Sequence, residues 1–125
     1  MSKKRVLVID DEQKVTRLIK QTLEVTKRYD VREANTGKEG LVLAKRLHPH
    51  LILLDVMMPE MDGVDVASAL QADERLKRTP IIFITGAVTK EETHQLGGVI
   101  GQHPCIAKPI DIHEVLSSVE EQFKK

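Results

Sequence analysis

The chain has 125 residues, 41% of them hydrophobic, and its 19 basic and 19 acidic residues give a formal net charge of +0. A chain of this length is the size of one domain and can fold alone. Because the charges balance and are interspersed, they give no overall signal for direct nucleic acid binding or for an anionic membrane surface. We therefore expect a single domain over residues 1–125.

Cysteine content and hydropathy predict where the protein resides. The single cysteine, Cys105, excludes an internal disulfide and is typical of a reducing compartment. No stretch approaches the roughly 20 apolar residues of a membrane span. The basic start is followed by a run of only four apolar residues before Asp10, too short for the apolar region of a signal peptide. We expect a cytoplasmic protein that does not insert into a membrane.

Short apolar runs alternate with helical periodicities along the first half of the chain. Residues 6–9 predict a first strand, and apolar residues then recur at helical spacing over 15–23. Residues 31–34 predict a short second strand, and the helical pattern over 41–47 ends before Pro49. Each strand of the first half is therefore followed by a helix.

The second half continues this alternation. Residues 51–54 predict a third strand, which leads into a loop at 57–63 whose proline and glycine interrupt regular structure. A helix over 64–70 follows, and residues 81–84 predict a fourth strand ending at Thr85.

The predicted fourth helix, over residues 90–96, is the weakest element. Gly97, Gly98 and Gly101 follow it closely, and glycine costs about 1 kcal/mol relative to alanine inside a helix. We expect that helix to be short and mobile. Residues 105–107 predict the fifth strand, and residues 112–123 form the clearest amphipathic helix.

Five strands that alternate with five helices predict an α/β fold, a three-layer sandwich around a parallel sheet. Ligands of such sheets bind beyond the carboxyl ends of the strands. The polar residues that follow the apolar runs would meet at that edge: Asp10, Asp11, Asp55, Thr85 and Lys108.

Three carboxylates that converge at one edge repel one another unless a cation binds or one carboxyl has a raised pKa. Oxygen ligands without histidine or cysteine favour a hard ion, and Mg²⁺ is the best match, with Mn²⁺ as an alternative. A carboxylate beside such an ion can attack phosphorus and form an aspartyl phosphate. The Lys108 ammonium and the Thr85 hydroxyl would then meet the phosphoryl oxygens.

Four motifs together resemble the receiver domain of bacterial two-component response regulators, over the whole chain. They are Val-Ile-Asp-Asp-Glu at 8–12, Asp-Val-Met-Met-Pro-Glu-Met-Asp-Gly at 55–63, Thr-Gly-Ala at 85–87 and Lys-Pro at 108–109. The resemblance implies a flavodoxin-like, doubly wound sheet of order 2-1-3-4-5. It also implies a phosphoryl donor, which is a histidine kinase or histidine phosphotransfer protein, and a downstream protein target.

The resemblance assigns a role to each site residue. Asp55 matches the phosphoacceptor, Asp11 a direct magnesium ligand, and Asp10 a ligand that acts through water. Met57 matches the position whose backbone carbonyl completes the metal shell. The remaining matches are Thr85 to the hydroxyl that follows the phosphoryl group, Lys108 to its pairing cation, Pro109 to a cis peptide and Gly63 to the turn behind the acceptor loop.

The chain departs from this family at the switch position. Most receivers carry tyrosine or phenylalanine three residues before the lysine, where this chain has Cys105. We hypothesise that the usual aromatic read-out is missing and that phosphorylation instead reorders the segment after Leu96. Met57 and Ala87, two residues beyond Asp55 and Thr85, cannot orient an attacking water, which predicts a long-lived acyl phosphate.

Other interpretations stay open at this point. Asp10 and Asp11 could cap the first helix. The fold could also serve an aspartyl-phosphate Mg²⁺ phosphohydrolase, although such enzymes usually carry a second acid at the position of Met57. A further alternative is an interaction module that is independent of phosphorylation. A flavodoxin-like cofactor binder would need a glycine-rich phosphate loop after the first strand, and there is none. We expect a signalling domain and not a metabolic enzyme.

Overall fold

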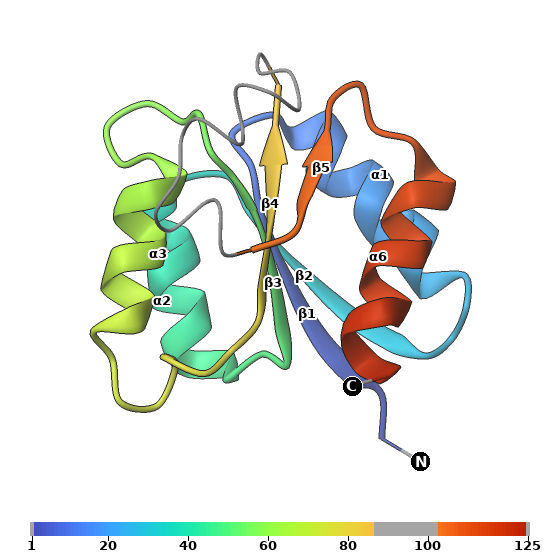
Figure 1. Ribbon diagram of the computed structural model, residues 1–125, viewed down its shortest axis with the longest axis horizontal. Helices are drawn as coiled ribbons and strands as arrows, with labels where there is room; N and C mark the ends of the chain where they lie inside the picture. The colour runs from blue at the N-terminus through green and yellow to red at the C-terminus, as the bar shows by residue number, and fades with distance from the viewer. Residues whose placement is uncertain (1, 87–102, 125) are drawn as a thin grey trace.

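A five-stranded parallel sheet forms the centre of the computed structural model, which describes residues 2–86 and 103–124 (Figure 1). The strands are β1 (Lys4–Ile9), β2 (Tyr29–Ala34), β3 (Leu51–Asp55), β4 (Ile81–Thr85) and β5 (Cys105–Ala107). Their order is β2-β1-β3-β4-β5, and all four neighbouring pairs are parallel. The predicted doubly wound sheet is confirmed.

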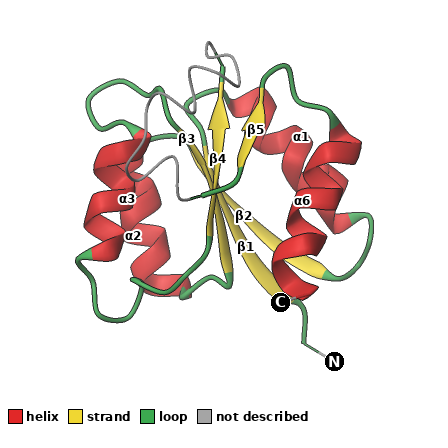
Figure 2. Cartoon of the chain, viewed as in Figure 1, coloured by secondary structure: helices red, strands yellow, loops and turns green. Residues whose placement is uncertain are grey.

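Helices cover both faces of this sheet (Figure 2). They are α1 (Gln13–Glu24), α2 (Gly37–Leu47), α3 (Gly63–Gln71) and α6 (Ile112–Lys124). Helices α1 and α6 lie on one face, and α2 and α3 on the other, which gives three layers. The predicted helix at residues 90–96 lies outside the described residues.

Two of the strands begin earlier than their apolar runs. β1 begins at Lys4 and β2 at Tyr29, and these two residues are partners in the parallel register. Lys4 is exposed, so a polar side chain at the start of a strand costs little there. Apolar runs therefore locate the buried part of a strand better than its full hydrogen-bonded length.

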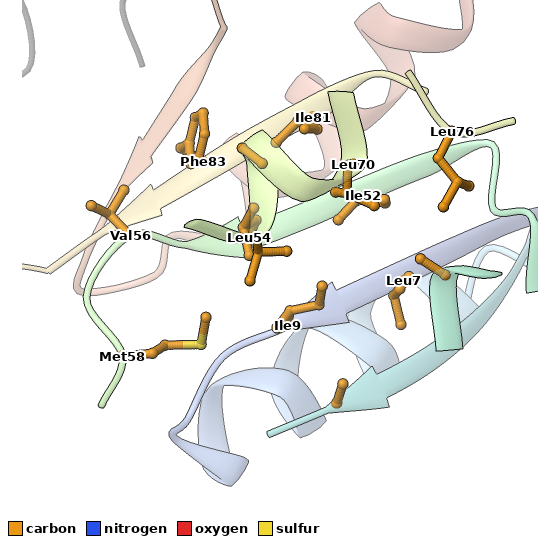
Figure 3. Packing of buried hydrophobic residues seen from close by; sticks show 14 residues of the cluster. Leu7, Ile9, Ile52, Leu54, Val56, Met58, Leu70, Leu76, Ile81 and Phe83 are labelled. Carbon is orange, nitrogen blue, oxygen red and sulfur yellow. The ribbon is translucent and has the colours of Figure 1, made fainter. Parts of the chain in front are cut away.

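Alternating side chains divide the core into two layers, one on each face of the sheet. Ile52 and Leu54 of β3 pack in the cluster that also contains α2 and α3 residues, as Figure 3 shows. Leu51 and Leu53 pack in the opposite cluster, with α1 and α6 residues. All of these side chains are fully buried, and each contributes roughly 1.5–3 kcal/mol. The run of consecutive apolar residues in β3 follows from burial on both faces.

The strand register brings the polar ends of the strands to one edge. Ile9, the last residue of β1, pairs with Leu54, so Asp10 and Asp55 follow at the same level. Thr85 at the end of β4 pairs with Ala107, the residue before Lys108.

In the described part of the chain, none of the helices is both long and apolar enough to cross a bilayer.

Candidate functional site

The loop after β1 carries one buried and one exposed carboxylate. Asp10 is fully buried and Asp11 is exposed. The Asp10 Oδ1 atom accepts a hydrogen bond from the Glu12 backbone N–H at 2.8 Å. Helix α1 has Glu12 as its N-cap residue, without a side-chain capping hydrogen bond. The capping interpretation of Asp10 and Asp11 is therefore wrong, because neither carboxylate caps α1.

Asp55 ends β3 beside these two acids. Its side chain is 2% exposed, and its Oδ1 lies 3.4 Å from the Met57 backbone N–H nitrogen, which donates to it. Asp10, Asp11 and Asp55 each offer a carboxylate oxygen, and these oxygens all lie within 4.8 Å of one another. The structure thus brings together the three acids that the sequence placed at this edge.

Lys108 supplies a positive charge to the cluster. Its Nζ atom lies 3.0 Å from Asp10 Oδ2, 3.7 Å from Asp55 Oδ2 and 2.7 Å from Glu12 Oε1. The Lys108 side chain is only 13% exposed. Burial acts to lower its pKa, but hydrogen bonds to Glu12 and Asp10 and the charges of Asp10 and Asp55 outweigh burial and raise it. Lys108 is therefore a fixed cation.

The two buried carboxyls have raised pKa values. Burial, followed by the charge of Asp10, raises the pKa of Asp55 from 3.8 to about 7 against the opposing effect of Lys108. Burial also raises the pKa of Asp10, although the Glu12 N–H and Lys108 oppose the rise. One lysine does not compensate for burying two carboxylates at this edge. A bound cation would favour the ionised forms.

The donor set fits a hard divalent cation. Asp10 Oδ2 is buried and makes no hydrogen bond of good geometry, although it faces the Lys108 ammonium across 3.0 Å. Its partner is thus an ion pair rather than a full set of hydrogen bonds, which leaves this oxygen able to ligate a cation. The three clustered side chains offer oxygen atoms alone, which suit Mg²⁺ or Mn²⁺ better than Zn²⁺.

The remaining predicted residues surround this cluster. Thr85 is buried at the end of β4, and its carbonyl oxygen accepts the Lys108 N–H at 2.8 Å. The Met57 side chain is 67% exposed. The Lys108–Pro109 peptide bond is cis. Ala87 lies outside the described residues.

Gly63 allows the acceptor loop to close against β3. A Cβ atom at this position would lie 2.3 Å from the Asp55 carbonyl oxygen and 2.8 Å from the Val56 Cα. The Gly63 N–H donates to the Val56 carbonyl at 2.9 Å, and the Asp62 side chain caps α3. The start of α3 therefore touches the backbone of Asp55, where only glycine fits.

Two residues near the acids have contacts that the sequence did not reveal. Glu12 pairs with Lys108, and the Asn35 side-chain amide donates to the Asp10 carbonyl at 2.9 Å. The Asp10 N–H also donates to the Ala34 carbonyl, so the loop after β1 is tied twice to the end of β2. An acid directly after the Asp10-Asp11 pair was the available signal for Glu12, whereas nothing local indicated Asn35.

Cys105 at the predicted switch position is half-buried. It pairs with Phe83 in the β4–β5 register and packs against the core layer under α2 and α3. Its Sγ atom lies 3.8 Å from the His103 carbonyl oxygen, and the His103 ring contacts the Phe83 ring edge-on, with centroids 5.6 Å apart. Burial raises the pKa of the Cys105 thiol. The Cys105 side chain therefore lies partly buried against this core layer.

Comparison with known proteins gives a consistent result. Residues 6–120 match the family described as the response regulator receiver domain. The chain is 35% identical over 121 residues to the DNA-binding dual master transcriptional regulator RpaA of Synechocystis sp., covering 97% of this chain and 49% of RpaA. It is 37% identical over 121 residues to the transcriptional regulatory protein SrrA of Staphylococcus aureus, covering 96% and 48%. The chain spans about half the length of these relatives.

Solved structures show the same similarity over whole chains. The chemotaxis protein CheY4 of Vibrio cholerae superposes with a TM-score of 0.86 at 28% identity, covering 96% of this chain and 98% of CheY4. The receiver domain of the Francisella response regulator 1452 superposes with a TM-score of 0.82 at 30% identity, covering 97% of each chain.

Proposed function

This chain belongs to the response regulator receiver domain family, and from that membership we propose that it accepts a phosphoryl group on Asp55. Receiver domains of response regulators are signalling domains of two-component systems. The observation that carries the proposal is the position of Asp55, a buried carboxylate with Asp10, Asp11 and Lys108 around it. The product of the reaction is a changed state of the domain, which a partner protein reads.

The phosphoryl transfer uses the Asp55 carboxylate as nucleophile. A carboxylate oxygen attacks the phosphorus of a phosphohistidine, the P–N bond breaks, and the imidazole nitrogen leaves with the bonding electron pair and takes up a proton. Lys108 offsets the negative charge that collects on the phosphoryl oxygens, and the Thr85 hydroxyl lies at the end of the neighbouring strand to hydrogen-bond them.

The acids and one carbonyl would hold the metal. Receiver domains generally use Mg²⁺, and Asp11, Asp10 through water, Asp55 and the Met57 carbonyl are the proposed ligands, with Mn²⁺ as an alternative ion. When bound, the ion supplies positive charge that keeps Asp55 ionised and screens the incoming phosphoryl group. Asp10 suits this role because its buried carboxylate lies in the cluster with Asp11 and Asp55, and its Oδ2 atom is held by an ion pair to Lys108 alone.

The partners follow from the chemistry and from the relatives. The donor is a histidine kinase or a histidine phosphotransfer protein, and the signal passes to a protein target. RpaA and SrrA are named as transcriptional regulators and are about twice as long as the stretch they share with this chain. We propose that residues 1–125 form one receiver domain that works in the cytoplasm and makes no direct contact with nucleic acid.

Intact-protein mass after incubation with acetyl phosphate and MgCl₂ tests this proposal. We expect the parent chain to gain one phosphoryl group, Asp55→Ala to gain none, and excess EDTA to prevent the gain. Asp30→Ala, which removes a carboxylate at the opposite end of the sheet, should behave as the parent does.

Three outcomes would contradict it. Equal phosphorylation of Asp55→Ala would move the acceptor elsewhere. Continuous turnover of simple phosphate esters would favour the phosphohydrolase. A parent chain that gains no mass while it still binds its partner would favour an interaction module independent of phosphorylation.

A further inference from the structure

Lys108 pairs more closely with Glu12 than with the proposed acceptor. The Nζ atom lies 2.7 Å from Glu12 Oε1 but 3.7 Å from Asp55 Oδ2. Glu12 is 60% exposed, whereas Asp55 is 2% exposed. The ammonium is therefore shared between the buried acids and a carboxylate on the outer side of the site.

The three carboxylates around Lys108 are not equivalent. In the proposed function, Asp10 and Asp55 face the metal ion, and a divalent cation repels the ammonium from the same oxygens. Glu12 is the N-cap residue of α1 and is not among the clustered metal-binding oxygens. When a metal ion binds, Asp10 and Asp55 face the ion. Among the described residues, Glu12 is then the one ion-pair partner of Lys108 that does not also face the ion.

We propose that Glu12 is a positioning residue that holds the Lys108 ammonium on the outer side of the site, away from Asp55, until a phosphoryl group on Asp55 draws the ammonium inward. This inference rests on the proposed phosphoacceptor function. A phosphoaspartate carries about −2 charge, whereas Glu12 carries one charge and is well exposed. Because ion pairs of exposed groups are weak, the phosphoryl group outcompetes Glu12 and Lys108 changes partner.

Competition for one ammonium has a definite consequence. If Glu12 keeps part of the Lys108 charge away from Asp55, then removing the Glu12 charge strengthens the contact between Lys108 and the phosphoryl group. The same change does not improve the metal site, because it removes a nearby negative charge and leaves Lys108 nearer to Asp10 and Asp55. Removing the Glu12 charge should therefore raise the affinity for a phosphoryl mimic without raising the affinity for Mg²⁺ alone.

The test uses Glu12→Gln, which keeps the shape of the side chain and removes its charge. With Mg²⁺ present, we expect the variant to bind beryllofluoride, a phosphoryl mimic, about two- to fivefold more tightly than the parent. Without beryllofluoride, Mg²⁺ should bind no more tightly than it does to the parent. Glu12→Asp, which keeps the charge, should stay closer to the parent. A loss of structure would weaken both affinities and could not produce this pattern.

Two further variants show whether the effect passes through Lys108. In a Lys108→Ala background, Glu12→Gln should no longer tighten beryllofluoride binding. Glu120→Gln makes the same chemical change in an ion pair with Arg28 at 3.0 Å, away from the site, and should leave both affinities unchanged. Unchanged or weaker beryllofluoride binding by Glu12→Gln, or an equal gain without Lys108, would overturn the inference. A parent chain that fails to bind beryllofluoride would instead refute the proposed function.

Discussion

The two ends of the sheet treat charge in opposite ways. At the amino ends of the strands, Arg28 and Glu120 form an ion pair at 3.0 Å with both side chains open to solvent, and the Arg5 guanidinium donates to the Leu47 and His48 carbonyls. At the carboxyl ends, Asp10 and Asp55 are buried and share one ammonium. The amino ends satisfy their charges locally, and the carboxyl ends do not.

This difference distinguishes charges that stabilise the fold from charges that serve a function. A buried carboxylate without full compensation destabilises the folded state, so its presence needs another reason. Perturbed pKa values cluster at functional sites for this reason, and Asp55, with its pKa of about 7, is the clearest case here. The buried carboxylates at the carboxyl edge lower the stability of the fold, and we explain their presence by the binding of a cation and the reaction with a phosphoryl donor.

Removing the Asp55 charge should give the largest change in stability. Because its folded pKa of about 7 exceeds the ordinary value of 3.8, the free energy of unfolding should fall as pH rises from about 4 to 7 in metal-free buffer. At 1.36 kcal/mol per unit the loss is at most about 4 kcal/mol. Urea denaturation at pH 4 and pH 8 should show Asp55→Asn more stable than the parent only at pH 8.

Added Mg²⁺ is the control for that comparison. It should raise the stability of the parent at pH 8 and reduce its difference from Asp55→Asn, because the cation compensates the ionised carboxylates. A parent chain whose stability does not change between pH 4 and pH 8 would show that ionising the buried carboxyls at this edge does not destabilise the fold.

Disturbing the close packing of Gly63 in the acceptor loop should have the second largest effect on the free energy of unfolding. Gly63→Ala places a methyl group 2.3 Å from the Asp55 carbonyl oxygen, so α3 must move away from β3. We expect a loss of about 2–3 kcal/mol in urea denaturation. Ser68→Ala, on the exposed face of the same helix, should stay within about 0.5 kcal/mol of the parent. Equal stability of the two variants would mean that the loop is less tightly packed than its geometry indicates.

Asn35 should affect the metal site more than the fold. Its amide holds the Asp10 carbonyl at 2.9 Å, so Asn35→Ala frees the loop that carries Asp10 and Asp11. We expect Mg²⁺ affinity to fall severalfold, which corresponds to about 1 kcal/mol for one hydrogen bond. Calorimetric titration with MgCl₂ measures this, and Asn35→Leu provides an uncharged variant of similar shape that cannot donate the bond. Parent-like affinity in both variants would remove Asn35 from the site.

The amino edge should tolerate the loss of its ion pair. Arg28→Ala and Glu120→Ala, singly and together, should change stability by less than about 1 kcal/mol, because both side chains are well exposed. A double-mutant cycle in urea gives the coupling energy. A coupling as large as the effect of Asp55→Asn would erase the contrast between the two edges.

The buried elements and the acidic edge could be predicted from the sequence because their signals are local. Fully apolar runs such as 51–54 mark strands buried on both faces, and acids directly after them fall at the carboxyl edge. The contacts of Glu12 and Asn35 could not be predicted, since they depend on the distance between groups that follow different strands. The register that sets this distance is a property of the whole sheet.

Reductive trapping of the phosphorylated residue tests the central assignment most directly. Borohydride converts an aspartyl phosphate to homoserine, so the chain would be incubated with acetyl phosphate and MgCl₂, reduced and mapped by peptide mass spectrometry. We predict homoserine at position 55, dependent on both reagents and absent at Asp10 and Asp11. Homoserine at another aspartate, with Asp55 intact, would contradict the account.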